Sequence, residues 1–325
     1  MTSTGPRAFS GSRLAWTDLP RPVRRRIGAL AGAEVVTEQV ATNGFSPGFA
    51  AVLELGDGTE IFVKAVSAEQ NPDSPLLARA EVQVAHVLPA GLAAPALRWH
   101  DDDGTWVLLG FDAVHGSAPE QPWRPEDLAR VLGALTELAE IGTPAPAELR
   151  PLADDMAELS LGWQRLVDPV PGSRDLARAV EAVGPHGPWL LEHLEDLVAW
   201  SAHAAAAGTG DTLVHGDLRA DNVILGEERV WLIDWPHATG EGARWWDLLS
   251  MLPSVAMQGG GDPDRLFWSH PNARGADRDA VRAVLAGITG YLVRGAVQPS
   301  PPGIANLRAF QLAQGVAALE WLRRL

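Results

Sequence analysis

The stretch VHGDLRADNVILGEERVWLIDWP, residues 214–236, decides the fold that we expect for this chain. Three of its polar side chains, Asp217, Asn222 and Asp234, are separated by five and then twelve positions. Between the second and the third, two short apolar runs flank the polar turn 226–229, a pattern that is typical of a β-hairpin. Because a hairpin brings its two ends together, an acid, an amide and a second acid are predicted to converge at one end of a small sheet.

These residue types are the set that phosphoryl transfer from a nucleotide uses. An aspartate accepts the proton of the attacking hydroxyl, while an asparagine and a second aspartate hold magnesium on the phosphates. The segment resembles the catalytic loop and metal-binding aspartate of the protein-kinase-like superfamily, in the His-Gly-Asp form of the aminoglycoside phosphotransferase family. The resemblance implies Asp217 as the catalytic base, and Asn222 and Asp234 as ligands of Mg²⁺.

Other residues near this motif take their expected roles from the same resemblance. His215 is expected to brace the loop. Arg219 stands where many kinases hold a cation near the γ-phosphate, so we place it in the catalytic group. Asp247, in the run RWWDLL, resembles the family aspartate that supports the catalytic loop from the next helix. Asp221 is expected to stabilise the loop or to face solvent.

The chain contains a single lysine, Lys64, against 25 arginines. It lies in the apolar run 61–66, which is expected to form a strand. A compact ammonium that fits between phosphates and a carboxylate cannot be exchanged for the larger, planar guanidinium. The strand resembles the kinase N-lobe strand whose lysine binds the α- and β-phosphates. Glu81, in the helix expected over 74–88, matches its carboxylate partner, and Glu69 is a less favoured rival.

The resemblance implies an α+β, bilobal protein-kinase-like fold with a small β-rich N-lobe and a larger, mainly helical C-lobe. The predicted boundaries are an N-lobe over 1–111, a hinge over 112–116 and a C-lobe over 117–325. The N-lobe is expected to contain a helix over 22–32 and strands at 35–36, 50–55, 61–66 and 106–111.

Two further nucleotide contacts are expected in the N-lobe. Ser46 lies in the small-residue loop 42–48 between two predicted strands, where it and nearby backbone amides can cap a β-phosphate. A simple hairpin without a phosphate contact is the alternative for this loop. Asp112 begins the hinge, where the adenine ring is expected to bind.

The acceptor is expected to be a small molecule. Only twelve residues separate Asp234 from Asp247, an interval that holds a long activation segment in protein kinases, so no protein substrate is expected. Carboxylates can pair with ammonium groups of a cationic acceptor, and tryptophans can stack on sugars or cations. The acceptor-binding candidates are Glu241, Asp262, Asp264, Trp245 and Trp268, followed by Asp154, Asp155, Glu158, Trp163 and Trp246.

Composition narrows the possible partners and the compartment. The formal net charge of −15 opposes binding to nucleic acid or to an anionic membrane. The absence of cysteine excludes disulfides, thiolate catalysis and cysteine-ligated metal sites. No apolar run is long enough to span a bilayer, and residues 1–13 lack the apolar core of a signal peptide. We therefore expect a cytoplasmic location.

The expected function is Mg²⁺-assisted transfer of the γ-phosphate of ATP or GTP to a hydroxyl of a small molecule, most simply an aminoglycoside-like or other antibiotic. A metabolic kinase of the same fold, acting on choline, homoserine or a sugar, is the first alternative, and its motifs are the same. A nucleotide-binding pseudokinase is a further alternative, although every side chain required for transfer is present.

Overall fold

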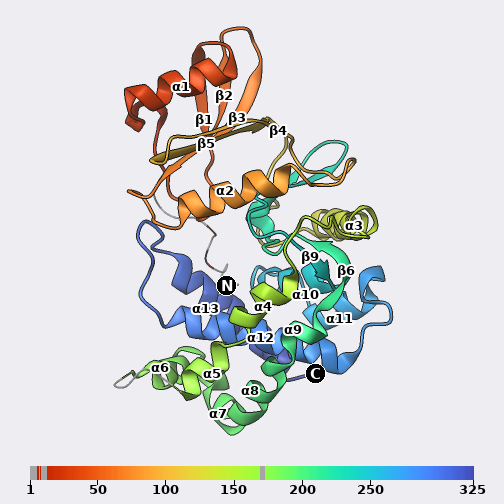
Figure 1. Ribbon diagram of the computed structural model, residues 1–325. Coiled ribbons are helices and arrows are strands. Elements are labelled where there is room, and N and C mark those ends of the chain that lie inside the picture. The colour runs from red at the N-terminus through yellow and green to blue at the C-terminus, as the bar shows by residue number, and fades with distance from the viewer. Residues whose placement is uncertain (1–5, 7, 9–12, 169–172) are drawn as a thin grey trace.

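The computed structural model describes residues 6, 8, 13–168 and 173–325. In Figure 1 a small sheet-containing lobe lies above a larger, mainly helical lobe, and this arrangement confirms the predicted α+β bilobal fold. Residues 1–13, from which we inferred that no signal peptide is present, lie mostly outside the described residues. None of the helices within the described ranges has the length and apolar character that a membrane crossing requires.

The described part of the smaller lobe contains a five-stranded antiparallel sheet with the order β1-β2-β3-β5-β4. Its strands are β1 Val35–Val40, β2 Phe49–Leu55, β3 Glu60–Ser67, β4 Leu97–Asp102 and β5 Trp106–Asp112. The sequence predicted all of these strands except β4. That strand reads LRWHDD and lies at the sheet edge, where only alternate residues are half-buried, so its apolar signal is weak.

Alternation along β3 gives the sheet two different faces. Ile61, Val63 and Ala65 pack with helix α1, Arg21–Ala31, in one apolar cluster. The intervening side chains point the other way because successive residues of a strand face opposite sides. Val66 packs with Ala78 of helix α2, Ser74–Ala85, and with β5. Lys64 therefore lies on the α2 face of the sheet, which is the face turned toward the second lobe (Figure 1).

The larger lobe is built around helix α12, Arg278–Ala296, which packs against α13, α8, α5 and α9. Its core contains the fully buried Trp163 and Trp321. The other helices of this lobe are α3 Pro125–Ile141, α4 Leu152–Leu159, α5 Gly162–Val167, α6 Asp175–Ala182, α7 Gly187–Glu192, α8 Leu194–Ala202, α9 Ala204–Ala207, α10 Trp246–Met257, α11 Pro263–Ser269 and α13 Leu307–Leu322.

Two small sheets lie between the helices and the N-terminal lobe. The predicted hairpin is present as β7, Val223–Leu225, and β8, Val230–Leu232. The second apolar run was expected to form a strand over 230–233, so β8 ends one residue earlier. The second sheet pairs β6, Thr209–Val214, with β9, Thr239–Gly242. Neither β6 nor β9 was predicted, because TGDTLV begins with four polar or small residues and TGEG has two glycines in four residues, so both carry little strand signal.

The hairpin is joined closely to the segment between the lobes. Leu225 and Ser117 exchange backbone hydrogen bonds of 2.8 and 3.3 Å. The neighbouring Gly116 has a φ of 151°, and a Cβ at this position would lie 2.4 Å from the carbonyl oxygen of Leu225. Glycine is therefore required where the connection passes the hairpin.

Candidate active site

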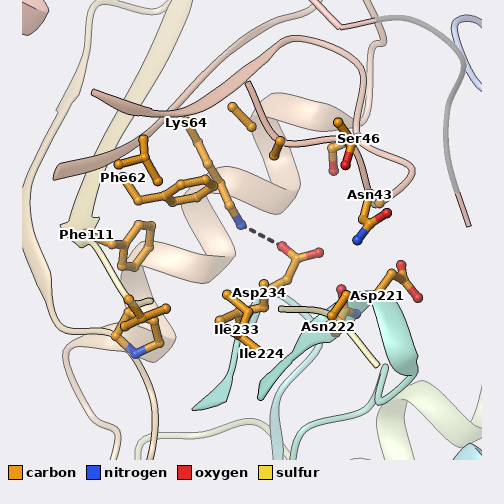
Figure 2. Close-up of a pocket in the computed structure, with 18 of the residues that line it drawn as sticks. Asn43, Ser46, Phe62, Lys64, Phe111, Asp221, Asn222, Ile224, Ile233 and Asp234 are labelled. Carbon is orange, nitrogen blue, oxygen red and sulfur yellow. Dashed lines mark hydrogen bonds and ion pairs between the residues drawn. The ribbon is translucent and has the colours of Figure 1, made fainter. Parts of the chain in front are cut away.

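A cavity of about 380 Å³ separates the sheet from the β7–β8 hairpin. Figure 2 shows its two halves. Phe62 and Phe111 from the sheet face Ile224 and Ile233 from the hairpin region, and Lys64 lies beside them. Polar side chains gather in the other half, namely Asn43, Ser46, Asp221, Asn222 and Asp234. The cavity is thus apolar and suited to a flat ring at one end, and charged at the other.

Lys64 is held between two carboxylates. Its Nζ donates hydrogen bonds to both oxygens of Glu81, each at 2.8 Å. It also donates to Oδ1 of Asp234 at 2.7 Å (Figure 2). Burial alone would lower the pKa of Lys64, but the charges of Asp234 and Glu81 outweigh it and raise the pKa. Lys64 therefore remains an ammonium, as contact with phosphates requires. Glu81 is the partner in this structure, as the helix position predicted, rather than Glu69.

Asp234 occupies an unusual backbone conformation. Its φ is 66°, in the left-handed region that non-glycine residues rarely adopt and that is concentrated at functional sites. Burial alone would raise the pKa of Asp234, but the charge and hydrogen bond of Lys64 outweigh it and lower the pKa to about 2. The side chain is therefore an ionised oxygen donor at the charged end of the cavity.

Asn222 lies across from Asp234 and is buried. Its Nδ2 donates to the backbone oxygen of Asp217 at 2.7 Å and to Oδ2 of Asp217 at 3.2 Å. Because the amide nitrogen makes these bonds, the amide oxygen is the atom that can bind a cation. An amide oxygen and a carboxylate oxygen are hard ligands that suit Mg²⁺, which completes its octahedron with waters and phosphate oxygens.

Asp217 and Arg219 form an ion pair next to Asp221 of the cavity wall. Arg219 also donates from Nε and Nη2 to the two carboxylate oxygens of Asp221, each at 3.0 Å. Its guanidinium carbon lies 5.5 Å from the ring centre of Phe45 and 5.6 Å from that of Phe310, distances typical of cation–π contacts. Burial raises the pKa of Asp217, and the charge of Arg219 opposes that rise.

The catalytic loop is braced from helix α10. The backbone N–H groups of His215 and Gly216 donate to the two carboxylate oxygens of Asp247 at 2.8 and 3.0 Å. Nε2 of His215 lies 3.0 Å from the backbone oxygen of Ile233. Burial lowers the pKa of His215 to about 4, so its ring is neutral at pH 7. These contacts fix the loop relative to β8 and α10, and they give His215 a positioning role.

The two other nucleotide contacts that the sequence suggested also line the cavity. Ser46 reaches from the loop between β1 and β2 toward Asp221 and Asn222 (Figure 2). Asp112 is the last residue of β5 and pairs with Arg98 through a hydrogen bond of 2.9 Å. Each therefore lies where a nucleotide would pass, Ser46 at the charged end and Asp112 beside the connection between the lobes.

Several acceptor candidates lie away from this cavity. Asp264 accepts hydrogen bonds from the indoles of Trp268 and Trp321, at 3.0 and 3.1 Å. Trp321 is near the end of α13 and Phe310 near its start, so Asp264 lies on the order of 16 Å along this helix from the Arg219 site. Asp262 pairs with Arg324 at the same end.

The remaining acceptor candidates also lie outside the cavity, in the core, on the surface or in ion pairs. Trp245 is buried against Phe267 at a ring distance of 6.1 Å. Glu241 is exposed in β9, with a φ of 55°. Of the secondary candidates, Asp155 pairs with Arg150, Glu158 with Arg165, and Trp163 and Trp246 belong to the core, whereas Asp154 is exposed on α4. None of the acids or tryptophans proposed for the acceptor lines the described cavity.

Sequence reasoning did not single out a tyrosine on which the charge of Asp217 acts. Tyr291, on α12, is the only tyrosine of the chain and is 47% exposed. Desolvation raises its pKa, and the negative charge of Asp217 adds to that rise. The positive charges of Arg308 and Arg219 act on Tyr291 in the opposite direction. A lone tyrosine in a chain with 13 tryptophans was the one signal that could have singled it out.

Comparison with known proteins agrees with this geometry. A family model described as the phosphotransferase enzyme family matches residues 44–284. No curated protein matches the sequence. Three similar solved structures are a spectinomycin phosphotransferase with ADP and spectinomycin, an aminoglycoside phosphotransferase with ADP and hygromycin B, and a choline kinase from Streptococcus pneumoniae.

The likeness to these three structures extends over nearly whole chains. Their sequence identities to this chain are 13, 16 and 15%, and their TM-scores are 0.58, 0.59 and 0.58. The alignments cover 94, 93 and 92% of this chain and 98% of each of the others. At such identities the likeness establishes the fold alone.

Proposed function

Because the chain belongs to the phosphotransferase enzyme family, we propose that it transfers the γ-phosphate of ATP or GTP to a hydroxyl of a small molecule. The observation that carries this proposal is the ion-paired group of Lys64, Glu81 and Asp234, which lines one cavity together with Asn222 and an apolar end. Asp217 is joined to this group through its hydrogen bond with Asn222. A nucleotide has the same polarity, with a flat base at one end and phosphates at the other.

The nucleotide fits the cavity in one direction. Its base would lie among Phe62, Phe111 and Ile233, near the connection that begins at Asp112. Its phosphates would then reach Lys64, whose ammonium is already balanced by two carboxylates. Ser46 and the backbone of its loop would cover the phosphates from above.

Asn222 and Asp234 would hold Mg²⁺ through their side-chain oxygens. The ion would bridge the phosphates and neutralise the negative charge that develops on them. The left-handed backbone of Asp234 turns its carboxylate toward both Lys64 and this position.

Asp217 would take the proton of the acceptor hydroxyl on its carboxylate. Burial raises its pKa, which makes it a better base than a solvated aspartate, while its ion pair with Arg219 keeps it ionised before the reaction. Arg219 is fixed by Asp221 and by two aromatic rings, so its charge stays next to the base. Most of the rate would come from this positioning and from electrostatic stabilisation.

For the acceptor we propose first an aminoglycoside-like or other antibiotic. Two of the similar structures, described as phosphotransferases, contain spectinomycin or hygromycin B, and this likeness supports the proposal. The second candidate is a metabolic kinase for choline, homoserine or a sugar. One of the similar structures is described as a choline kinase, and this likeness supports the second candidate.

A coupled assay can decide between these acceptors. The protein is mixed with Mg·ATP or Mg·GTP and a panel of aminoglycosides, other antibiotics, amino alcohols and sugars, and nucleoside diphosphate release is followed. Mass spectrometry must then find an acceptor that has gained one phosphate. If the protein binds nucleotide but phosphorylates no compound of a broad panel, the pseudokinase alternative is favoured.

A further inference from the structure

The residues just before α1 contact the loop that covers the charged end of the cavity. The backbone N–H of Leu14 donates to the oxygen of Gly48 at 3.0 Å, and the N–H of Gly44 donates to the oxygen of Ala8 at 3.0 Å. Nη2 of Arg13 donates to the backbone oxygen of Asn43 at 2.5 Å. These bonds hold Arg13 at the tip of the loop between β1 and β2.

The guanidinium of Arg13 enters the same cavity as Lys64 and Asp234. Asn43, to which it is bonded, lies over Asp221 and Asn222 and away from Phe62 and Phe111 (Figure 2). Arg13 is therefore at the charged end of the cavity, not at the end that suits a base.

Arg13 has one buried donor without an acceptor. Its Nε is buried and has no hydrogen-bond partner among the residues that the structure describes. A buried donor without an acceptor costs free energy, and a charged donor costs more than a neutral one. Burial lowers the pKa of Arg13, while the charges of Asp234 and Asp221 oppose this. The guanidinium is thus attracted to Asp234 and Asp221, but these carboxylates do not accept a hydrogen bond from its Nε in the described structure.

We propose that Arg13 is a phosphate-binding residue of the nucleotide site, and that its guanidinium binds the terminal phosphate. A guanidinium presents planar paired donors that match phosphate oxygens, and a phosphate would satisfy the buried Nε. Lys64 is bound to Glu81 and Asp234 from the sheet side, so Arg13 would supply a second cation from the loop tip. This inference rests on the proposed function, because it requires a nucleotide in this cavity.

The test compares nucleotides that differ in the terminal phosphate. Calorimetry measures the affinity of the full chain for Mg·ADP and for Mg·AMP-PNP, which is not hydrolysed. Arg13→Ala should weaken the affinity for Mg·AMP-PNP by about tenfold or more, since a hydrogen bond to a charged group is lost. The affinity for Mg·ADP should change by less than about twofold. The ³¹P resonance of the terminal phosphate should shift between the two proteins.

Two variants serve as controls. Arg13→Lys keeps the charge without the fork and should recover part of the preference for AMP-PNP. Arg25→Ala removes an exposed arginine of α1 that does not line this cavity, and it should leave both affinities unchanged. Thermal unfolding of each variant without nucleotide checks that the loop contacts are retained.

Each other outcome overturns the proposal. An equal loss of affinity for both nucleotides means that Arg13 only holds the loop in place. Tighter binding of Mg·AMP-PNP to Arg13→Ala means that the guanidinium competes with the phosphates. If the unmodified protein binds neither nucleotide, the proposed function fails together with this inference, whereas normal binding with no effect of Arg13→Ala overturns this inference alone.

Discussion

Lys64 shows how informative a residue can be when it is the only one of its type in the chain. The chain uses arginine 25 times and lysine once, and that lysine has Glu81 and Asp234 within 2.8 Å. The gap between these carboxylates is sized for an ammonium, and a planar guanidinium is larger and needs a different arrangement of acceptors.

We therefore expect Lys64→Arg to lower activity substantially while changing the melting temperature of the nucleotide-free protein by little. Chemical labelling gives a second measurement, because an amine-selective reagent has only Lys64 and the N-terminus to modify. Saturating Mg·ATP should protect Lys64 from the reagent and preserve activity. Labelling at the same rate with and without nucleotide would remove Lys64 from the site.

Asp217 gives a prediction that separates chemistry from binding. Asp217→Asn removes the proton acceptor but keeps the size of the side chain, so turnover should fall by roughly 10²–10⁴-fold while nucleotide affinity stays nearly unchanged. Asp279→Asn, at an aspartate whose side chain is 82% exposed on α12, is a control that should retain full activity. Near-normal turnover of Asp217→Asn on an identified acceptor would refute the assignment.

At the residue scale, the sequence identified side chains whose roles depend on a local motif, and it missed those whose roles depend on tertiary placement. Asp217, Asn222 and Asp234 lie within one hairpin and its approach, so their spacing was enough to bring them together. Arg13 reaches the cavity only because residues 8 and 14 bond to a loop 30 or more positions away. Nothing in the sequence around Arg13 encodes that contact.

At the scale of elements, the β7–β8 hairpin positions the oxygens that we propose as Mg²⁺ ligands. Asn222 immediately precedes β7 and Asp234 closely follows β8, so pairing of the strands sets the distance between them. The backbone N–H of Ile233 donates to the backbone oxygen of Asn222 at 3.0 Å, and this bond closes the open end of the hairpin. A change at either end should therefore alter metal binding without unfolding the lobe.

We expect Asn222→Ala and Asp234→Asn each to reduce Mg²⁺-dependent nucleotide affinity by at least about tenfold, because each removes or weakens an oxygen ligand. Asparagine is chosen at position 234 because it tolerates the left-handed backbone, whereas alanine would add strain. Glu227→Gln, in the exposed turn of the same hairpin, is the matched control. Unchanged affinity and unchanged magnesium dependence in both variants would contradict the metal role.

The elements themselves were predicted where their pattern is strong. Strands β2, β3 and β5 are apolar and buried in the sheet, and they lie where the sequence placed them. Strand β4 is half-polar because it lies at an edge, and β9 contains two glycines in four residues, so neither carries the period that identifies a strand. The distance of Asp264 from Arg219 could not be predicted for a related reason: the periodicity of α11 and α13 predicts helices but not which end of α13 lies beside Arg219.

At the scale of the whole molecule, the cavity is lined by both lobes, and a ligand bound there would contact residues from each. The lobes are also linked by a hydrogen bond of 3.0 Å from Nδ2 of Asn71 to the oxygen of Pro302, and by one of 2.8 Å from the N–H of Leu232 to the oxygen of Ala93. Bound nucleotide should therefore stabilise the molecule as one unit.

We expect a single unfolding transition whose midpoint rises with nucleotide. At a free concentration of 100 times its Kd, Mg·ADP should add about 2.7 kcal/mol to the free energy of unfolding. Differential scanning calorimetry with and without Mg·ADP measures this shift, and Asn222→Ala should reduce it. Two separate transitions, of which only one responds to nucleotide, would show that the lobes unfold independently.

The contact among Phe45, Arg219 and Phe310 has a consequence for how the affinities for two ligands depend on each other. Phe45 belongs to the loop between β1 and β2 and Phe310 to α13, and their rings lie 5.2 Å apart with Arg219 against both. An acceptor that moves α13 would therefore also move the loop that covers the nucleotide. Coupling of this kind is reciprocal by thermodynamic necessity: the factor by which an acceptor changes the Kd of the nucleotide equals the factor by which the nucleotide changes the Kd of the acceptor.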